Sequence, residues 1–307
     1  IIDGNYLPNK NELEFDISLD KLRLNIFEPY LKENISELRG IASGKLKLEG
    51  QLKKPVLNGI VQLQKSSFTI NYLQTRYNLS DSIFVENNLI KFENTKINDS
   101  KYGTSAIAKG EIRHDYFKNF FFDINIVADK FLCLDTRESD NELYFGTAFA
   151  SGLIKINGAL SNIEMDINAK TEKNSRFYIP LTSESEISES NFITFVNENI
   201  KQLEIIEEES VDLSGVKLNF QLEVTPECEA QLIFDSKMGD VIKGNGNANL
   251  KMEISSAGEF NMFGNYEIDR GEYNFTLQNF FSKKFRIKKG GTIKWNGDPY
   301  DADVDLL

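Results

Sequence analysis

Apolar and polar residues alternate over most of the chain. Residues 13–19 read LEFDISL, and the same period of two recurs in many later runs, the longest of which extends from Ile242 to Ile254. Strict alternation is typical of a β-strand with one dry face and one wet face. Aromatic and β-branched residues, which favour strands, are frequent in these runs. The pattern therefore predicts an all-β protein.

Turn signals separate the alternating runs. Asn-Gly pairs occupy 58–59 and 157–158, and the sequence NGDP occupies 296–299. Such pairs favour tight hairpins, so we expect consecutive strands to be antiparallel. Segments beginning near Gly40, Ala148 and Gly244 also share one order of glycines and strands. Repeated units of this kind stack side by side, which predicts one long sheet.

Two segments break the alternation and predict one or two short amphipathic helices. In residues 28–40, apolar residues recur at helical spacing, with Pro29 suited to a first turn and Gly40 to a stop. Residues 183–210 have a similar apolar spacing between acidic runs. This second helix is expected either to cap an end of the sheet or to plug an exposed apolar face.

These breaks suggest four regions. Residues 1–37 form N-terminal strands and a short helix that continue a longer β-groove, and residues 38–170 form a groove of repeating β-meanders. Residues 171–212 form an acidic insertion, and residues 213–307 form a C-terminal β-groove. No signal peptide and no apolar stretch of about 18 residues is visible. Both ends read as cuts in a longer protein.

Charge and composition argue against several classes of function. The formal net charge of −12 disfavours nucleic acid, which needs clustered basic residues, and disfavours adsorption to anionic membranes. A single histidine, His114, would have to carry any histidine-based metal site or relay, and we expect it to be a polar surface residue. No nucleotide-binding, hydrolase or calcium-loop motif is present. We therefore predict that the chain is not an enzyme and that it needs no metal or cofactor.

Three smaller features each have two readings. Cys133 and Cys228 are expected to be reduced, half-buried thiols, with a disulfide as the alternative. The acidic residues 301, 303 and 305 fit a solvated strand face better than a calcium site. A basic cluster either protects an edge strand from aggregation or contacts lipid phosphates or an acidic partner. It consists of Lys283, Lys284, Arg286, Lys288 and Lys289.

Residues 264–306 resemble the C-terminal signature of the TamB family. A pattern G-x-Y-x-I-x-x-G-x-Y-x-F runs from Gly264 to Phe275, and K-F-x-I-x-x-G-G-T-I-x-W-x-G-D-P-x-D-A runs from Lys284 to Ala302. Earlier segments such as GIASGKLKLEGQLKKPVLNG fit as well, so the resemblance extends from about Leu38 onward.

The resemblance implies an envelope protein of Gram-negative bacteria. Its fold would be an elongated, curled antiparallel sheet with a hydrophobic concave groove. The parent protein would be anchored in the inner membrane by an N-terminal helix, with this part in the periplasm. Phospholipid acyl chains and an outer-membrane Omp85 or TamA-like barrel would be its partners, although the strands that contact the barrel are missing here. The alternative is a scaffold that assembles outer-membrane or autotransported proteins by strand addition.

The alternation itself predicts which side chains point into such a groove. A packed sandwich core, in a structural or adhesive repeat module, is the other reading of the same residues. The predicted groove residues are Val216, Leu218, Phe220, Leu222, Val224, Leu250, Met252, Ile254, Tyr273, Phe275, Leu277, Phe285, Ile287, Ile293 and Trp295. Gly244, Gly246 and Ala248 are expected to leave space beside them.

Overall fold

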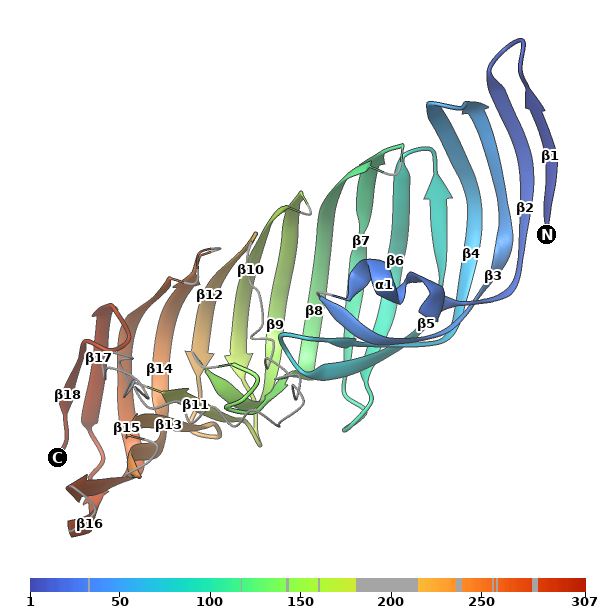
Figure 1. Cartoon of the computed structure of the whole chain (residues 1–307). Helices are drawn as coiled ribbons and strands as arrows, with labels where there is room; N and C mark the ends of the chain where they lie inside the picture. Colours follow the sequence, from blue (N-terminus) through green and yellow to red (C-terminus); the bar gives the residue numbers. More distant parts are fainter. Residues whose placement is uncertain are drawn as a thin grey trace, which may run out of the picture.

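The fold is one elongated sheet. The computed structural model describes residues 1–32, 34–116, 118–141, 144–159, 161–180, 215–235, 239–255, 257, 259–277 and 281–307. These residues form an 18-stranded sheet that extends from the N terminus at one end to the C terminus at the other (Figure 1). The prediction of an all-β, elongated and curled sheet is confirmed.

The strands differ widely in length, from four residues to 19. They are β1 (Ile2–Leu7), β2 (Glu12–Arg23), β3 (Ile35–Gln51), β4 (Lys54–Ile70), β5 (Thr75–Glu86), β6 (Leu89–Asp99), β7 (Ser105–Asp115), β8 (Lys118–Thr136), β9 (Phe145–Ala159), β10 (Asn162–Thr171), β11 (Arg176–Pro180), β12 (Val216–Val224), β13 (Glu229–Asp235), β14 (Asp240–Ile254), β15 (Phe260–Leu277), β16 (Phe281–Ile287), β17 (Gly291–Gly297) and β18 (Ala302–Asp305).

Most neighbouring strands are antiparallel, as the turn signals predict. From β1 to β9 each strand pairs with the next, and β14 pairs with β15 in the same way. The exception lies between β10–β11 and β12–β13, which run parallel. A parallel neighbour needs a long connection, and 35 residues of the sequence separate the end of β11 from the start of β12. The acidic run of the predicted insertion, residues 183–210, lies outside the described residues. The insertion was predicted to begin at residue 171, and part of it before the acidic run forms β11.

The short helical segment is smaller than predicted. A 3₁₀ turn, η1 (Leu24–Phe27), leads into a single α-helical turn, α1 (Glu28–Leu31), with Pro29 in its first turn as expected. Ile35 and Leu38 were assigned to this helix, but they lie in β3. The error has a local cause, because Leu31, Ile35 and Leu38 fit helical spacing, whereas register shifts between Ser36 and Ile41 interrupt the period of two at the start of β3. The second predicted helix lies outside the described residues.

Aligned irregularities bend the sheet along its length. Bulges interrupt β2 near Lys21, β4 near Lys65, β6 near Asn94 and β8 near Lys130. Each of these residues has a positive φ, between 49° and 53°. A bulge kinks its strand and increases the twist, so bulges repeated on alternate strands fold the sheet along one line. The two halves of the sheet then face each other across a trough.

The same type of hydrogen bond occurs at three of these bulges. The backbone N–H of Lys21, Lys65 or Lys130 donates to a serine hydroxyl on the following strand, at 2.9–3.2 Å. The acceptors are Ser43, Ser80 and Ser151. The serine stands opposite the bulge and binds the N–H that the ladder leaves unpaired. This repeated device was not predicted from the sequence.

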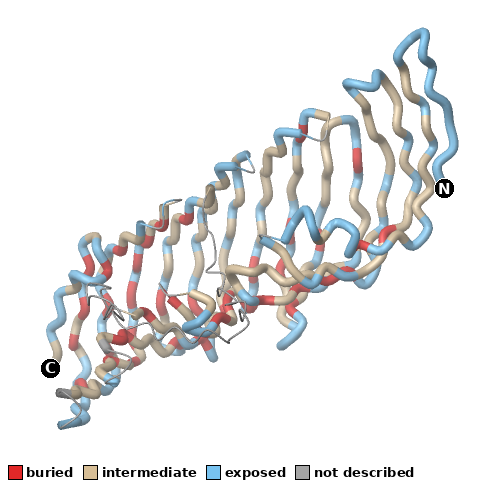
Figure 2. Tube along the Cα trace, viewed as in Figure 1, coloured by how far each residue is buried: buried red, intermediate tan, exposed pale blue. Residues whose placement is uncertain are grey.

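The two faces of the sheet have opposite chemistry. On the convex face, charged side chains pair across strands, as in Lys217–Glu164 at 3.0 Å and Lys243–Glu272 at 3.5 Å. On the concave face, the register aligns apolar side chains in rows. Buried residues gather on this face toward the C terminus, whereas the strands nearest the N terminus are mostly half-buried or exposed (Figure 2).

Replacement of Ser151 tests whether the serine hydrogen bond at a bulge stabilises the sheet. Ser151→Ala removes the acceptor for the Lys130 N–H and the donor to Glu172, which lies 2.7 Å away. An unmet hydrogen bond of this kind costs about 1 kcal/mol, so urea unfolding should show a free energy of unfolding lower by that amount. Ser282→Ala, on the exposed surface of β16, is the control. Equal stabilities of the two variants would contradict the role of Ser151.

Candidate functional site

The concave face encloses one long apolar cavity. It extends from β4 to β17 and has a volume of about 540 Å³, within the ~300–1,000 Å³ range of ligand pockets. Its walls come from both halves of the bent sheet, for example Phe68 and Tyr77 on one side and Met165 and Ile167 on the other. Among the described residues that line it, Asp81 alone carries a formal charge. The cavity therefore suits an elongated apolar ligand.

The floor of the cavity changes from small to large residues along the sheet. One row of register partners begins with Ala106, Ala128, Gly152 and Ala169 on β7 to β10. It continues through Leu222, Leu250, Gly264 and Trp295 on β12 to β17. Small side chains leave the trough hollow in its middle, and large ones fill it toward the C terminus.

The C-terminal part is packed as a core. Met262 and Ile268 are fully buried, and residues from the opposing wall, such as Ile179 and Leu232, belong to the same apolar cluster. Gly246, which was expected to leave space, instead allows close packing, since a Cβ there would lie 3.0 Å from the ring of Tyr266. This end corresponds to the alternative reading of a closed core, and the middle of the sheet to an open groove.

A contact across the trough lies between these two regions. The hydroxyl of Tyr72, in the turn between β4 and β5, lies 3.9 Å from the Met165 sulfur on β10. Leu73 beside it packs in a cluster with Leu218 and Ile254. Burial raises the pKa of Tyr72 to about 12. The turn after β4 therefore roofs the groove at this point.

Most polar side-chain atoms along the groove form hydrogen bonds with backbone atoms. The hydroxyl of Tyr77 donates to the Leu132 carbonyl at 3.0 Å, and the Trp295 indole donates to the Pro299 carbonyl at 3.2 Å. Cys133 and Cys228 are free thiols that line the groove, and burial raises their pKa to about 12 and about 11. These groups present little polarity to a ligand.

Most of the predicted groove residues lie along this cavity. The nine that line it are Leu218, Phe220, Leu222, Val224, Leu250, Met252, Ile254, Ile293 and Trp295.

The other six lie beside it. Val216, Tyr273 and Ile287 pack against the apolar clusters, whereas Phe275 is half-buried. Phe285 is 44% exposed on β16, because that short strand pairs with β15 alone among the described strands. Leu277 ends β15, and its side chain lies outside the described residues.

Sequence reasoning predicted a groove in the N-terminal half but named none of its lining residues. Residues of β4 to β9, including Phe68, Tyr77 and Phe131, contribute a large share of the lining. The signal was available, because Tyr77, Leu79, Asp81 and Ile83 follow a period of two and all line the groove. The bulges hide the rest, since each one shifts the alternation by a residue.

The residues of the predicted basic cluster lie on different faces of the sheet. Lys283 lies on the concave face, opposite Phe275 and 4.9 Å from the ring of Phe285. Lys284 and Arg286 alternate with it and face the convex side, and Lys289 pairs with Asp269 at 2.9 Å. The Lys288 N–H donates to the Leu307 carbonyl. The five residues do not form one basic surface.

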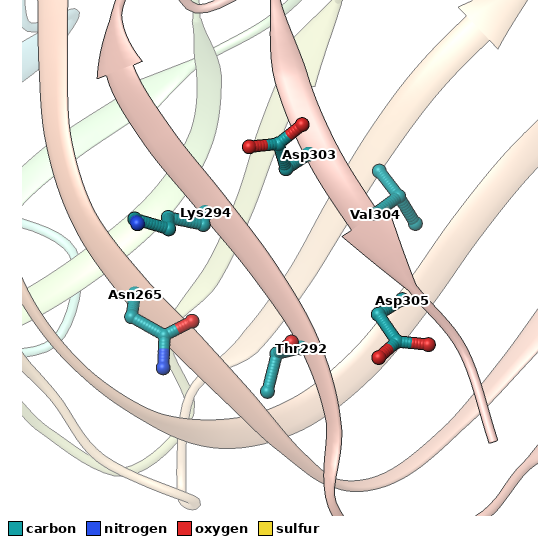
Figure 3. A pocket seen from close by; sticks show the side chains of 6 residues that line it. All are labelled: Asn265, Thr292, Lys294, Asp303, Val304 and Asp305. Carbon is teal, nitrogen blue, oxygen red and sulfur yellow. The ribbon is translucent and has the colours of Figure 1, made fainter.

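The C-terminal acidic residues lie on the convex face. Asp303 and Asp305 of β18 border a shallow polar hollow with Asn265, Thr292 and Lys294 (Figure 3). No group of three or more possible metal ligands occurs among the described residues.

Comparison with known proteins places the chain in a family. The model of the TamB C-terminal domain matches residues 93–307, more than two thirds of the chain. The chain belongs to the TamB family. A search of curated proteins and a search of solved structures each found no match. The TamB match begins at residue 93, whereas the resemblance of the sequence was traced from about Leu38.

TamB proteins belong to the bacterial envelope. None of the described helices of this TamB chain is long and apolar enough to cross a membrane.

The single histidine of this TamB chain is buried, not on the surface as predicted. His114 is 3% exposed and its ring lies 5.7 Å from that of Phe120. The alternation accounts for it, because His114 follows Ile112 on the concave side of β7. Burial lowers the pKa of His114, an effect that nearby Asp115 only partly opposes.

The lowered pKa of His114 predicts a pH dependence of stability. The neutral form is favoured in the folded state, so stability is complete above about pH 6.5 and falls as the pH drops toward the lower pKa of the folded protein. Urea unfolding at pH 7.5 and 5.5 should show this loss in the wild type and a smaller one in His114→Gln. The window isolates the effect, because the chain has one histidine and carboxylates titrate lower. An equal loss in both proteins would contradict it.

Truncations should distinguish the packed end of the sheet from the open one. Met262→Ala leaves a cavity in a full core and should cost about 2–5 kcal/mol of unfolding free energy. Leu46→Ala, at a half-buried position of β3, should cost about 1 kcal/mol, since less apolar surface returns to water. Chemical denaturation measures both, and similar losses would show that the two ends are equally packed.

Proposed function

We propose that this chain carries phospholipid acyl chains along its groove between the inner and outer membranes. The observation that supports the proposal is the continuous apolar cavity from β4 to β17, whose lining among the described residues carries one charge. A lipid tail needs such a path, because contact with water is unfavourable for its methylene groups.

The energetics fit this role. Each CH₂ withdrawn from water gains ~0.8 kcal/mol, so a sixteen-carbon chain gains about 12 kcal/mol. Free transfer through water is therefore slow, and a sheltered path lowers the barrier. Apolar attraction has no preferred direction, so a tail moves from one strand to the next without breaking specific bonds. The large residues near Trp295 and the Tyr72 roof imply that the walls part when a lipid passes.

The family supports the location and the partner. We infer that the chain works in the periplasm, with a parent protein held in the inner membrane, and that an Omp85-class barrel receives it at the outer membrane. The chain has no catalytic role in this proposal, since movement of a lipid makes and breaks no covalent bond.

Assembly of outer-membrane proteins by strand addition is the second candidate. It is favoured by β16, which pairs on one side alone among the described strands and so presents unpaired backbone groups. Photocrosslinkers placed along β16 would capture client polypeptide in this case, and lipid would be captured from positions inside the groove in the first.

A pair of adjacent substitutions tests the lipid role. Leu63 lines the groove, whereas Gln62 beside it on β4 points to the convex side. Leu63→Asp places a charge on the lipid path and should remove most of the phospholipid that co-purifies with the chain. Gln62→Asp adds the same charge outside and should leave it unchanged. Lipid extraction and mass spectrometry measure both, and the absence of lipid from the wild-type chain would end the proposal.

A further inference from the structure

The sheet contains an unpaired seam between β5 and β6. These strands pair at Asn78–Asn98 near one end and at Phe84–Lys91 near the other. Between these points, no register pair joins residues 79–83 to residues 92–97 in the described structure. The ladders on both sides are also interrupted at this level, between Leu63 and Ser66 on β4 and between Phe92 and Thr95 on β6. The seam is therefore a local opening of the strand pairing at the line of bulges.

Polar residues account for the opening. The N–H of Ser82 donates to the carboxylate of Asp81 at 2.7 Å, and Asn94 adopts a positive φ of 53°. Side chains that bind the local backbone compete with the ladder, and serine, aspartate and asparagine are poor strand formers. The sequence thus interrupts the pairing of β5 with β6 at the level of the bulges.

Two polar side chains face the groove at the seam. Asp81 on β5 and Thr95 on β6 both line the groove along the seam. Thr95 is 6% exposed, and its hydroxyl has no hydrogen-bond partner among the described residues. No described basic side chain forms an ion pair with Asp81, although ion pairs are frequent on the convex face. A carboxylate and an unmatched hydroxyl thus both lie along the seam, in a lining whose other described residues carry no formal charge.

We propose that this seam binds the ammonium group of a lipid whose tails lie in the groove. The inference rests on the proposed function and names the lipid class. When a tail fills the groove, it removes water from Asp81 and cannot replace the lost hydrogen bonds. An ammonium group supplies both the opposite charge and N–H donors, and the Thr95 hydroxyl accepts a further bond. Ile83 and Phe92 flank the seam and contact the first methylene groups.

Competition between two lipids with the same tails tests the seam. The purified chain is incubated with vesicles of palmitoyl-oleoyl phosphatidylethanolamine and phosphatidylglycerol in equal amounts, reisolated and analysed by mass spectrometry. One charge-assisted hydrogen bond corresponds to roughly tenfold in affinity, so the amine lipid should be enriched about tenfold. Asp81→Asn should return the ratio toward one, and Thr95→Val should reduce it. Asp123→Asn, on the convex face of β8, should keep the wild-type ratio.

The outcomes separate this inference from the proposed function. Equal retention of both lipids, or an unchanged preference in Asp81→Asn, overturns the seam and leaves lipid carriage intact. Absence of both lipids from the wild type overturns lipid carriage. In that case, binding of single-chain amphiphiles tests whether the seam binds an ammonium group. Decylammonium and decyl maltoside are titrated by calorimetry below their micelle concentrations. Binding of decylammonium that Asp81→Asn abolishes supports it, and equal binding of the two amphiphiles overturns it.

Discussion

The structure depends on one constraint, which is the burial of a single apolar face by a single sheet. Eighteen strands expose a continuous dry surface, and no second layer covers it in the described residues. The sheet meets this constraint by bending on itself, so that its two halves shield each other. Bulges at Lys21, Lys65, Asn94 and Lys130 provide the bend. The groove is the space that remains where the facing side chains are too small to meet.

The size of the floor residues decides whether a stretch of this sheet is a core or a conduit. Alanine and glycine on β7 to β10 leave room, whereas Leu250 and Trp295 fill the same row further along. The same backbone thus supports a stable end and an open middle. Stability comes from the packed end, and a ligand gains most from the open part, where apolar surface remains exposed to water.

The proposed lipid path contains departures from a uniform apolar lining. Tyr72 roofs the trough, and Asp81 with Thr95 places polarity beside an unpaired seam. A uniform groove would shelter any tail equally, because apolar contact has no direction. Polar groups at one place add a dependence on the headgroup, and a roof adds a step at which the walls must move. These departures are where such a protein distinguishes among amphiphiles.

The period of two determined the all-β fold, the face of the strands without bulges and nine residues that line the groove, because alternation survives in any sheet that buries one side. The family signature near Trp295 determined the relationship to TamB. The tertiary structure alone decided the parallel step at β10–β12, the roof at Tyr72 and the lining of β6 and β8 beyond their bulges. Each depends on contacts between residues far apart in the chain, or on bulges that shift the alternation. Whether a row of apolar side chains becomes a core or a groove depends on what lies across the trough, and no local pattern records that.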